Sequence, residues 1–541
     1  MNTLFRIAFG DYEFVLDRGS LTYSLTETKT QTVWATDLSL GWIELKERGT
    51  DNITRTDFGD CTLISISEKM SAAGKRILLG LDAPGGVPVD IYLICGPKEI
   101  QLTVEASRDS KTHLLERVGL LPGLCRANKS DYLVIPHAEG MMLRPEEFTD
   151  KSYLSHFLHV WDASLGLAMP FIGAVSGTSA LALLTDSAYG GVHLIGGREK
   201  CLCANWIYGR DPERRRLDMR IIALPNGDHV RIARAYREKL INERNHVTLR
   251  KKMRDRPALA EALDALWVPE STASEILEEL GILKRVQPKE LSVTLLGETQ
   301  SKWNEMEDQL QNFSTLAEEH PLLTVTNNAD WLAHAVEGWE GKRYRQKVTL
   351  WGRPLPLMAV VYHDAVISVN PILWSNYRRH DPWPQQFLRA LLTLSAPSIQ
   401  VSRGKGRDAE QFSPDGKIDQ YRAIAALLGP LHALAFPAFL TAHKFLTPDF
   451  LVEEAYYSDK TYVLINQSET EEYETVELCL PPGGFYVRHA QFEAHDALRV
   501  GTVNFPTRAW RMRRSLDGKP LEQSQEIEEK DFLVVPPPGG G

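Results

Sequence analysis

The stretch LSVTLLGETQSKWNEMEDQLQNFSTLAEEHPLLTVTNNAD, from Leu291 to Asp330, indicates the fold of the central part of the chain. It begins and ends with apolar, β-branched runs, LSVTLLGE (291–298) and PLLTVTNNAD (321–330), which predict two strands. The segment between them predicts a helix. Since a helix between two strands is typical of a parallel sheet, this stretch predicts an α/β region.

The same alternation continues on both sides of this unit. Further strands are predicted at ALDALWVPE (262–270), in the apolar run from Leu357 to Val361, and at SIQVSRG (398–404). Further helices are predicted at STASEILEELGILKR (271–285, with Ser271 as N-cap), WLAHAVEGWEGKRY (331–344), WPQQFLRALLTLSA (383–396) and KIDQYRAIAALLGPLHALAF (417–436). About five or six units fit here, whereas a full eight-unit barrel takes about 250 residues. We therefore predict a (β/α) barrel domain over residues 251–448 that is short or irregular.

The N-terminal part of the chain has a different pattern. Residues 1–250 hold many short apolar or alternating runs, such as CTLISIS, VDIYLICG and IQLTVEAS, separated by Gly, Asp, Asn and Pro. This pattern predicts a large antiparallel β-sandwich. A helix is predicted over residues 229–245, where an apolar stripe is formed by Ile232, Ala235, Tyr236 and Leu240.

Strand-like runs return after the last predicted helix. LVEEAYYSD, TYVLINQ and ETVELCLPPGGFYVRHA predict a small C-terminal β-sandwich over residues 449–541. The sequence as a whole therefore predicts a multidomain α+β protein with three parts, a β-sandwich, a barrel and a second β-sandwich.

The composition is that of a soluble globular protein with several domains. Of 541 residues, 43% are hydrophobic and 24% are charged. The chain carries 61 basic and 71 acidic side chains, and no stripe of Lys and Arg is present that would bind nucleic acid. No apolar run is long enough to cross a membrane. The oligomeric state is left open.

The cysteines and the N-terminus favour a cytoplasmic location. The N-terminal residues lack the features of a secretory signal, although a processed secreted form would look the same. Six scattered cysteines are typical of free thiols in a reducing compartment, namely Cys61, Cys95, Cys125, Cys201, Cys203 and Cys479.

Several stretches resemble a known group of enzymes. The segment from Leu431 to Val487 resembles the junction of the barrel and the C-terminal β domain in the endo-α-N-acetylgalactosaminidase and bifidobacterial α-N-acetylgalactosaminidase families. YLVIPHAEGMMLRP (132–145) and GTSALALLTDSAYGGVHL (177–194) resemble their large sandwich, and RPLPLMAVVYHDAVISVN (353–370) resembles a late barrel strand. The resemblance implies a glycoside hydrolase that cleaves an O-glycosidic bond, with an α-linked N-acetylgalactosamine-type sugar as the expected substrate.

Carboxylates follow the predicted strands, where a barrel enzyme carries its active site. Glycoside hydrolysis uses two carboxyl groups, about 5 Å apart or about 6.5–9.5 Å apart according to the mechanism. The carboxylates at such positions are Glu270, Glu298, Asp330 and Asp364. We predict that the catalytic pair comes from Asp364, Asp330 and Glu298. The competing interpretation is that each is a helix cap or a partner in a surface ion pair.

Aromatic and polar side chains near these carboxylates suit a carbohydrate. Sugar rings present apolar C–H faces to aromatic rings, whereas their hydroxyls bind polar side chains. The predicted substrate-binding residues are Tyr362, His363, Asn327, Trp331, Trp351, Trp374 and His443. The competing interpretation is that the tryptophans pack between helices and barrel and that the two histidines have structural roles.

One departure from the family pattern leaves two hypotheses open. Asn327 and Asn328 stand near the start of a segment where these families tend to carry a glutamate. The chain is then either an active glycosidase with an altered carboxylate pair, or a catalytically inactive relative that binds carbohydrate.

No cofactor is predicted. The sequence has no spacing of His and Cys typical of zinc, no glycine-rich dinucleotide fingerprint and no phosphate-binding loop. A run of alternating acidic ligands that would predict calcium is also lacking. The expected partner is a carbohydrate.

Overall fold

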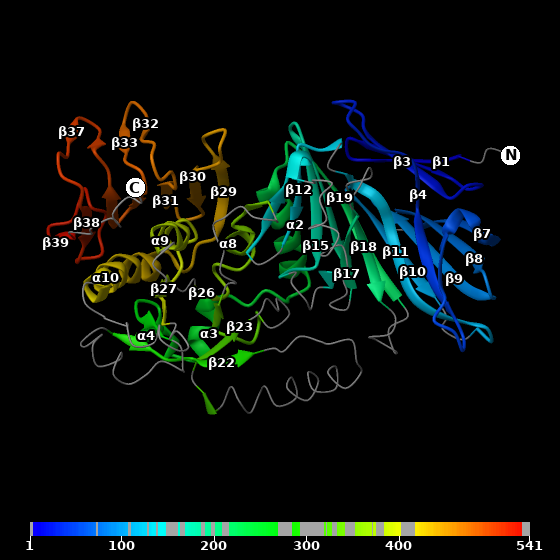
Figure 1. The fold of residues 1–541 in the computed structure, drawn as a ribbon, viewed down its shortest axis with the longest axis horizontal. Helices are drawn as coiled ribbons and strands as arrows, with labels where there is room; N and C mark the ends of the chain where they lie inside the picture. The colour runs from blue at the N-terminus through cyan, green and yellow to red at the C-terminus, as the bar shows by residue number, and fades with distance from the viewer. Residues whose placement is uncertain are drawn as a thin grey trace.

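A computed structural model of the chain has an elongated shape, with antiparallel sheets at both ends and parallel strands with helices between them (Figure 1). The structure describes residues 4–71, 74–106, 110–126, 129–136, 139–147, 161–162, 168–185, 190–195, 201–207, 216–268, 284–292, 319–320, 322–326, 333–340, 352–369, 372–374, 383–401 and 417–532.

Three antiparallel sheets form the N-terminal part. The four-stranded sheet contains β1 (Leu4–Phe9), β2 (Tyr12–Asp17), β3 (Thr22–Glu27) and β4 (Val33–Ser39). The six-stranded sheet has the order β14 (Trp161–Asp162), β17 (Gly190–Ile195), β18 (Cys201–Ile207), β11 (His113–Arg126), β5 (Gly41–Glu47) and β6 (Ile53–Asp57). The ten-stranded sheet has the order β25 (Arg353–Pro354), β13 (Met141–Leu143), β12 (Tyr132–Ile135), β15 (Phe171–Ser176), β16 (Ser179–Thr185), β19 (Arg216–Pro225), β10 (Glu99–Ala106), β9 (Val87–Cys95), β8 (Gly74–Ala83) and β7 (Thr62–Ser71). Two short 3₁₀ helices, η1 (Phe58–Asp60) and η3 (Pro145–Glu147), interrupt these strands.

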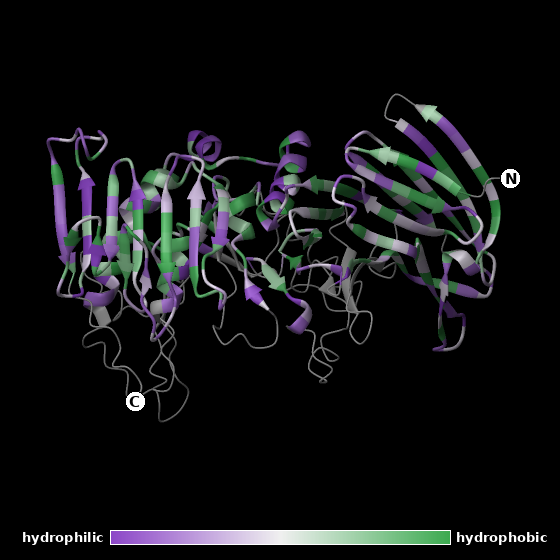
Figure 2. Ribbon diagram, turned by 90° about the horizontal axis from the view of Figure 1, so that it is seen from above, coloured by the Kyte–Doolittle hydropathy of each residue, from purple (hydrophilic) through white to green (hydrophobic). Residues whose placement is uncertain are grey.

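A common core holds these sheets together. Trp34 from β4, Ile91 from β9 and Val118 from β11 belong to one buried cluster, so the sheets pack face to face. In β9, buried residues alternate with more exposed ones, because successive side chains point to opposite faces of a sheet. Figure 2 shows this alternation of hydrophobic and hydrophilic residues along the strands. The predicted N-terminal antiparallel β-sheet architecture is confirmed.

Helix α2 (His229–Asn242) leaves the ten-stranded sheet as the sequence predicts. Its N-cap Asp228 accepts a hydrogen bond from the backbone N–H of Arg231 at 2.9 Å. The predicted apolar stripe is buried, and Ile232 packs so closely on Gly173 that a Cβ at this glycine would lie 2.6 Å from the side chain. Helix α2 is therefore fixed on the outer face of β15 and β16.

Parallel strands and helices occupy the middle of the molecule. The strands are β20 (Leu266–Trp267), β21 (Arg285–Val286), β22 (Lys289–Ser292), β23 (Leu323–Thr326), β24 (Gly338–Glu340), β26 (Ile367–Val369), β27 (Ile372–Trp374) and β28 (Ile399–Val401). The helices are α3 (Leu249–Asp255), α4 (Leu259–Ala262), α8 (Leu357–Val361), α9 (Trp383–Leu392) and α10 (Lys417–Ala435). Parallel pairs join β20 to β21, β22 to β23, β23 to β24, β24 to β26, and β27 to β28. Strand–helix alternation is thus present, and α9 and α10 are confirmed.

Two predicted elements are wrong. The run from Leu357 to Val361 forms helix α8, with all of its residues buried, and not a strand. A short, wholly apolar run fits a buried strand and a buried helix equally well, so periodicity could not separate them. The helix predicted over residues 331–344 is also wrong in its described part, where a turn at 333–335 leads into β24.

The C-terminal part contains two antiparallel sheets. The seven-stranded sheet has the order β29 (Leu440–Phe445), β30 (Val452–Tyr457), β31 (Tyr462–Asn466), β34 (Phe485–His489), β35 (Phe492–Asp496), β38 (Trp510–Ser515) and β39 (Ile527–Phe532). The four-stranded sheet has β32 (Tyr473–Glu474), β33 (Leu478–Leu480), β36 (Arg499–Val500) and β37 (Val503–Asn504). Helix α9 packs on the larger sheet, where Phe387 stacks on Trp510 with ring centroids 4.2 Å apart.

One strand links the middle of the chain to the N-terminal sheet. β25 pairs with β13 in the register Met141↔Pro354 and Met142↔Arg353, so it completes the edge of the ten-stranded sheet. The seven-stranded sheet likewise begins at Leu440, before the predicted C-terminal domain. The boundaries 1–250, 251–448 and 449–541 stay predictions.

Within the described ranges, no helix is both long enough and apolar enough to span a membrane. Cys61, Cys95 and Cys479 are free cysteines, and their side chains and that of Cys125 are buried.

Candidate functional site

The triplet Tyr362, His363 and Asp364 lies in a turn between α8 and β26. Tyr362 ends the helix, and its backbone N–H donates to the carbonyl oxygen of Met358 at 2.8 Å. Because α8 is a helix, Asp364 comes before a parallel strand and does not follow one. It therefore lies at the amino-terminal ends of the strands, whereas active sites of parallel β/α folds lie at the carboxyl ends.

Asp364 forms a buried ion pair. Its two carboxylate oxygens each accept a hydrogen bond of 2.7 Å from Arg237 of α2, and His246 Nε2 lies 3.3 Å from Oδ1. Burial acts to raise the pKa of Asp364, but the hydrogen bonds from Arg237 and His246 outweigh it and hold the pKa at about 2. The carboxylate is thus charged at neutral pH and already has its partners.

Tyr362 and His363 are buried beside this pair. The Tyr362 ring stacks on His246 at 6.1 Å and on Trp339 at 6.0 Å between centroids. His363 places Nδ1 2.7 Å from the carbonyl oxygen of Ala438 and Nε2 3.1 Å from that of Leu394. These contacts are structural, and the predicted substrate-binding roles of Tyr362 and His363 stay predictions.

His443 lies in β29 and is also buried. Its Nδ1 is 3.0 Å from Nε2 of His229, and its Nε2 is 2.8 Å from Oε2 of Glu453. Both ring nitrogens are therefore engaged by protein groups, and the predicted contact of His443 with substrate stays a prediction.

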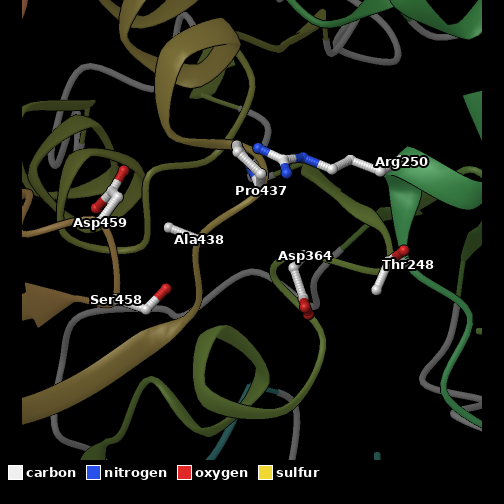
Figure 3. Close-up of a pocket in the computed structure, with 7 residues that line it drawn as sticks. All are labelled: Thr248, Arg250, Asp364, Pro437, Ala438, Ser458 and Asp459. Atoms are coloured by element: carbon white, nitrogen blue, oxygen red, sulfur yellow. The ribbon is translucent and has the colours of Figure 1, made fainter.

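A cavity of about 330 Å³ opens beside Asp364 (Figure 3). It is lined by Thr248, Arg250, Asp364, Pro437, Ala438, Ser458 and Asp459. Thr248 caps α3, and the Asp459 Oδ1 accepts a hydrogen bond from the Thr461 N–H at 2.9 Å in the turn between β30 and β31. One of the two carboxylates in this cavity is held by Arg237, so the cavity does not offer two free carboxyl groups. The sequence did not single out Arg250, Ser458 or Asp459, because Arg250 lies in α3 and the other two lie far away in the chain, in the turn between β30 and β31.

A buried lysine holds the same end of the parallel strands together. The Lys252 ammonium donates to the backbone carbonyls of Ala333, Val336 and Ala365 at 2.6, 2.5 and 2.7 Å. Burial lowers its pKa to about 7. Nearby, Glu337 is hydrogen-bonded to Arg256 and accepts from the Leu323 N–H at 2.8 Å. These contacts join the segments that precede β23, β24 and β26, which is a role in stability.

We expect Lys252→Met to lower the free energy of unfolding by about 2–4 kcal/mol, because three buried carbonyls lose their shared donor. Urea denaturation at pH 6 measures this change. Lys251→Met is the matched control, since Lys251 is the exposed neighbour on the same helix. If both variants lost the same small amount of unfolding free energy, the stabilising role of Lys252 would be contradicted.

The residues that follow the parallel strands include most of the predicted site. Asp330, Glu298, Asn327, Trp331 and Trp351 lie outside the described residues, as does the side chain of Trp374, whose backbone ends β27. In the chain, Glu298 follows β22 and Asp330 follows β23, and these two strands are parallel neighbours with Ser292 opposite Thr326. Among the described residues, no group of three potential metal ligands occurs.

Comparison with solved structures identifies a known fold. The chain is similar to the α-N-acetylgalactosaminidase NagBb from Bifidobacterium bifidum. The NagBb complex with GalNAc has a TM-score of 0.67 and 14% identity and covers 85% of this chain and 98% of that one. For ligand-free NagBb the TM-score is 0.66 and the identity 13%, with the same coverage. No protein-family model matches the chain, and no curated protein matches its sequence. At this identity the likeness concerns the fold, and it confirms the resemblance seen in the sequence.

Proposed function

We propose that the chain is a glycoside hydrolase that binds its sugar at the carboxyl ends of the parallel strands. The observation that carries this proposal is the structural likeness to NagBb, which extends over 98% of that enzyme. Because NagBb is named as an α-N-acetylgalactosaminidase, an α-linked N-acetylgalactosamine-type sugar is the expected substrate.

The parallel strands form a small closed barrel in this proposal. Bridges join Trp267 to Ser398 and Val369 to Ala396. If β21 continues into β22, the described pairings and bridges lead from β20 through β22, β23, β24 and β26 to the segment that enters β28, and from there back to β20. Gly338 supports this closure, since a Cβ there would lie 2.7 Å from the Trp267 ring and 2.6 Å from Thr324 Oγ1. Side chains of three strands therefore meet in one interior, as in a barrel.

Asp330 and Glu298 are the proposed catalytic pair. They follow neighbouring parallel strands, and such strands lie about 4.7–4.9 Å apart. Carboxyl groups on adjacent loops can therefore reach the separations of about 5–9.5 Å that glycoside hydrolysis uses. One carboxylate acts as nucleophile or stabilises the positive charge at the anomeric carbon, and the other protonates the leaving oxygen. Asp364 is left out of the pair because it lies at the opposite ends of the strands, bound to Arg237.

The remaining predicted residues bind the sugar. Trp331, Trp351 and Trp374 offer aromatic faces to the C–H faces of the ring, and the Asn327 amide binds a hydroxyl. A catalytically inactive carbohydrate binder is the second candidate function, favoured by the amides of Asn327 and Asn328 where related families tend to carry a glutamate.

A hydrolysis screen tests the proposal. The purified protein is incubated with aryl α- and β-glycosides, including N-acetylgalactosaminides, and release of the aryl group is measured. We expect turnover of an α-N-acetylgalactosaminide. Absence of turnover, with free sugars raising the melting temperature, would establish the binder instead. If the protein shows no turnover and free sugars cause no thermal shift, both proposed functions are overturned.

A further inference from the structure

A continuous line of hydrogen bonds crosses the interior between the N-terminal and C-terminal sheets. Tyr132 Oη lies 3.1 Å from His229 Nδ1, His229 Nε2 lies 3.0 Å from His443 Nδ1, and His443 Nε2 lies 2.8 Å from Glu453 Oε2. The groups come from β12, α2, β29 and β30, which lie near the middle of the molecule (Figure 1). The two histidines are 214 positions apart in the sequence.

Glu453 determines where the protons lie at neutral pH. Its carboxylate accepts hydrogen bonds from Arg389 Nη1 at 2.9 and 2.8 Å and one from Gln467. Burial acts to raise the pKa of Glu453, but the charge of Arg389 and the hydrogen bond from His443 lower it, so Glu453 is ionised and only accepts.

The donor and acceptor of each remaining hydrogen bond follow from the ionised state of Glu453. Because Glu453 accepts, His443 donates through Nε2–H, and in its neutral form its Nδ1 must accept. His229 then donates through Nε2–H, and its own Nδ1 accepts from the Tyr132 hydroxyl. With both rings neutral, each histidine is the Nε2–H tautomer, and all three hydrogen bonds of the line are formed.

The same line can hold one more proton. Tyr132 gives its hydroxyl proton to His229 Nδ1 and takes one from hydronium in the acidic solvent, which leaves water, while His229 passes its Nε2 proton to His443 Nδ1. Afterwards His229 is a neutral Nδ1–H tautomer that donates to Tyr132 Oη, and His443 is an imidazolium that donates to both His229 Nε2 and Glu453. One positive charge has been added, and each of the three contacts is still a hydrogen bond.

We propose that Tyr132, His229, His443 and Glu453 form a proton relay, which takes up one proton in acid and reverses the direction of its hydrogen bonds while the joint between the sheets stays intact. The added charge rests on His443 because the Glu453 carboxylate faces it. Among the described residues, His229 contacts Tyr132 and His443 and no carboxylate, and burial and His443 lower its pKa far below the ordinary value.

The other groups around the relay fit this assignment. Arg389 and His443 both donate to Oε2 of Glu453, and the ring of Phe445 packs edge-on against His443 at 5.0 Å between centroids. At the Tyr132 end of the relay, burial is the main cause that raises the pKa of Tyr132. The negative charge of Asp228, the N-cap of α2, raises it further. Tyr132 therefore stays protonated and can serve as donor in one state and acceptor in the other.

Nuclear magnetic resonance of ¹⁵N-labelled histidine side chains tests the relay in the intact protein. At pH 7.5 we expect both histidines as Nε2–H tautomers. On acidification, His229 should change to the Nδ1–H tautomer at the same midpoint at which His443 becomes doubly protonated. His229→Gln and His443→Gln assign the signals, and near-ultraviolet circular dichroism shows that the protein stays folded through the transition.

Tyr132→Phe is the conservative variant, because only the hydroxyl is lost. His229 Nδ1 loses its partner in both states, and an N–H donor without an acceptor is tolerated less well than an acceptor without a donor. We therefore expect proton affinity to fall about tenfold, which is a midpoint about one pH unit lower. His432, a buried histidine whose Nδ1–H donates to the Leu263 carbonyl oxygen at 2.6 Å, is the unaffected reference. Separate midpoints for His229 and His443, an Nδ1–H tautomer of His229 at pH 7.5, no protonation of His443 before unfolding, or an unchanged midpoint in Tyr132→Phe would each overturn the relay.

Discussion

Asp330→Asn and Glu298→Gln are each expected to lower kcat/KM for the best aryl glycoside by about 10³-fold or more, with an unchanged melting temperature. The reason is chemical, because an amide can neither attack the anomeric carbon nor protonate the leaving oxygen. Initial rates over a range of substrate concentrations measure this loss, and thermal denaturation measures the folding of each variant.

The matched control is Asp419→Asn, which removes an exposed carboxylate on α10 that pairs with Arg422 three residues away. It should retain full activity. Activity at the parental level in both site variants would exclude the proposed pair, and loss in only one would leave the second carboxylate to be found among the other segments that follow the strands.

Asp364→Asn is expected to lower the free energy of unfolding by about 3–5 kcal/mol, because it leaves the Arg237 guanidinium buried beside a neutral amide. The carboxylate and the guanidinium have only 9% and 8% of their side-chain surfaces exposed, so both groups are largely removed from water. Urea denaturation at pH 7 measures the change. The activity of the folded variant should be kept, in contrast to a catalytic carboxylate.

The same pair makes stability depend on pH. The folded pKa of Asp364 is about 2, below the ordinary 3.8, so its stabilisation is present above pH 4 and is lost as the pH falls toward 2. Asp364→Asn should therefore flatten the decline of stability in this interval. Glu529→Gln, which breaks an exposed pair with Arg513, is the control and should change stability by less than about 0.5 kcal/mol. Complete loss of turnover in a fully stable Asp364→Asn protein would instead make Asp364 catalytic.

The long periodic elements could be predicted from the sequence, and the short apolar ones could not. Helices α2, α9 and α10 have enough turns for their apolar stripes to be recognised, and the β-rich ends of the chain carry regular turn signals. The run from Leu357 to Val361 has only five residues, all buried, so its conformation depends on the packing around it.

The role of Asp364 depended on that one local conformation. A strand would have placed the carboxylate at the carboxyl end of the sheet, whereas helix α8 places it at the amino end. Its partner Arg237 lies 127 positions earlier in the sequence, and no local sequence pattern predicts an ion pair between residues so far apart. The sites proposed at Asp330 and Glu298 still rest on their order in the chain.

The ten-stranded N-terminal sheet can be completed only after strand β25 has been synthesised. β13 leaves the ribosome well before Arg353 and Pro354, and until they arrive its Met141, Met142 and Leu143, buried in the finished protein, border an open edge. An open apolar edge can recruit other chains. A fragment that ends at residue 250 would keep this edge permanently, so cutting the protein into pieces at the apparent change of pattern would favour aggregation.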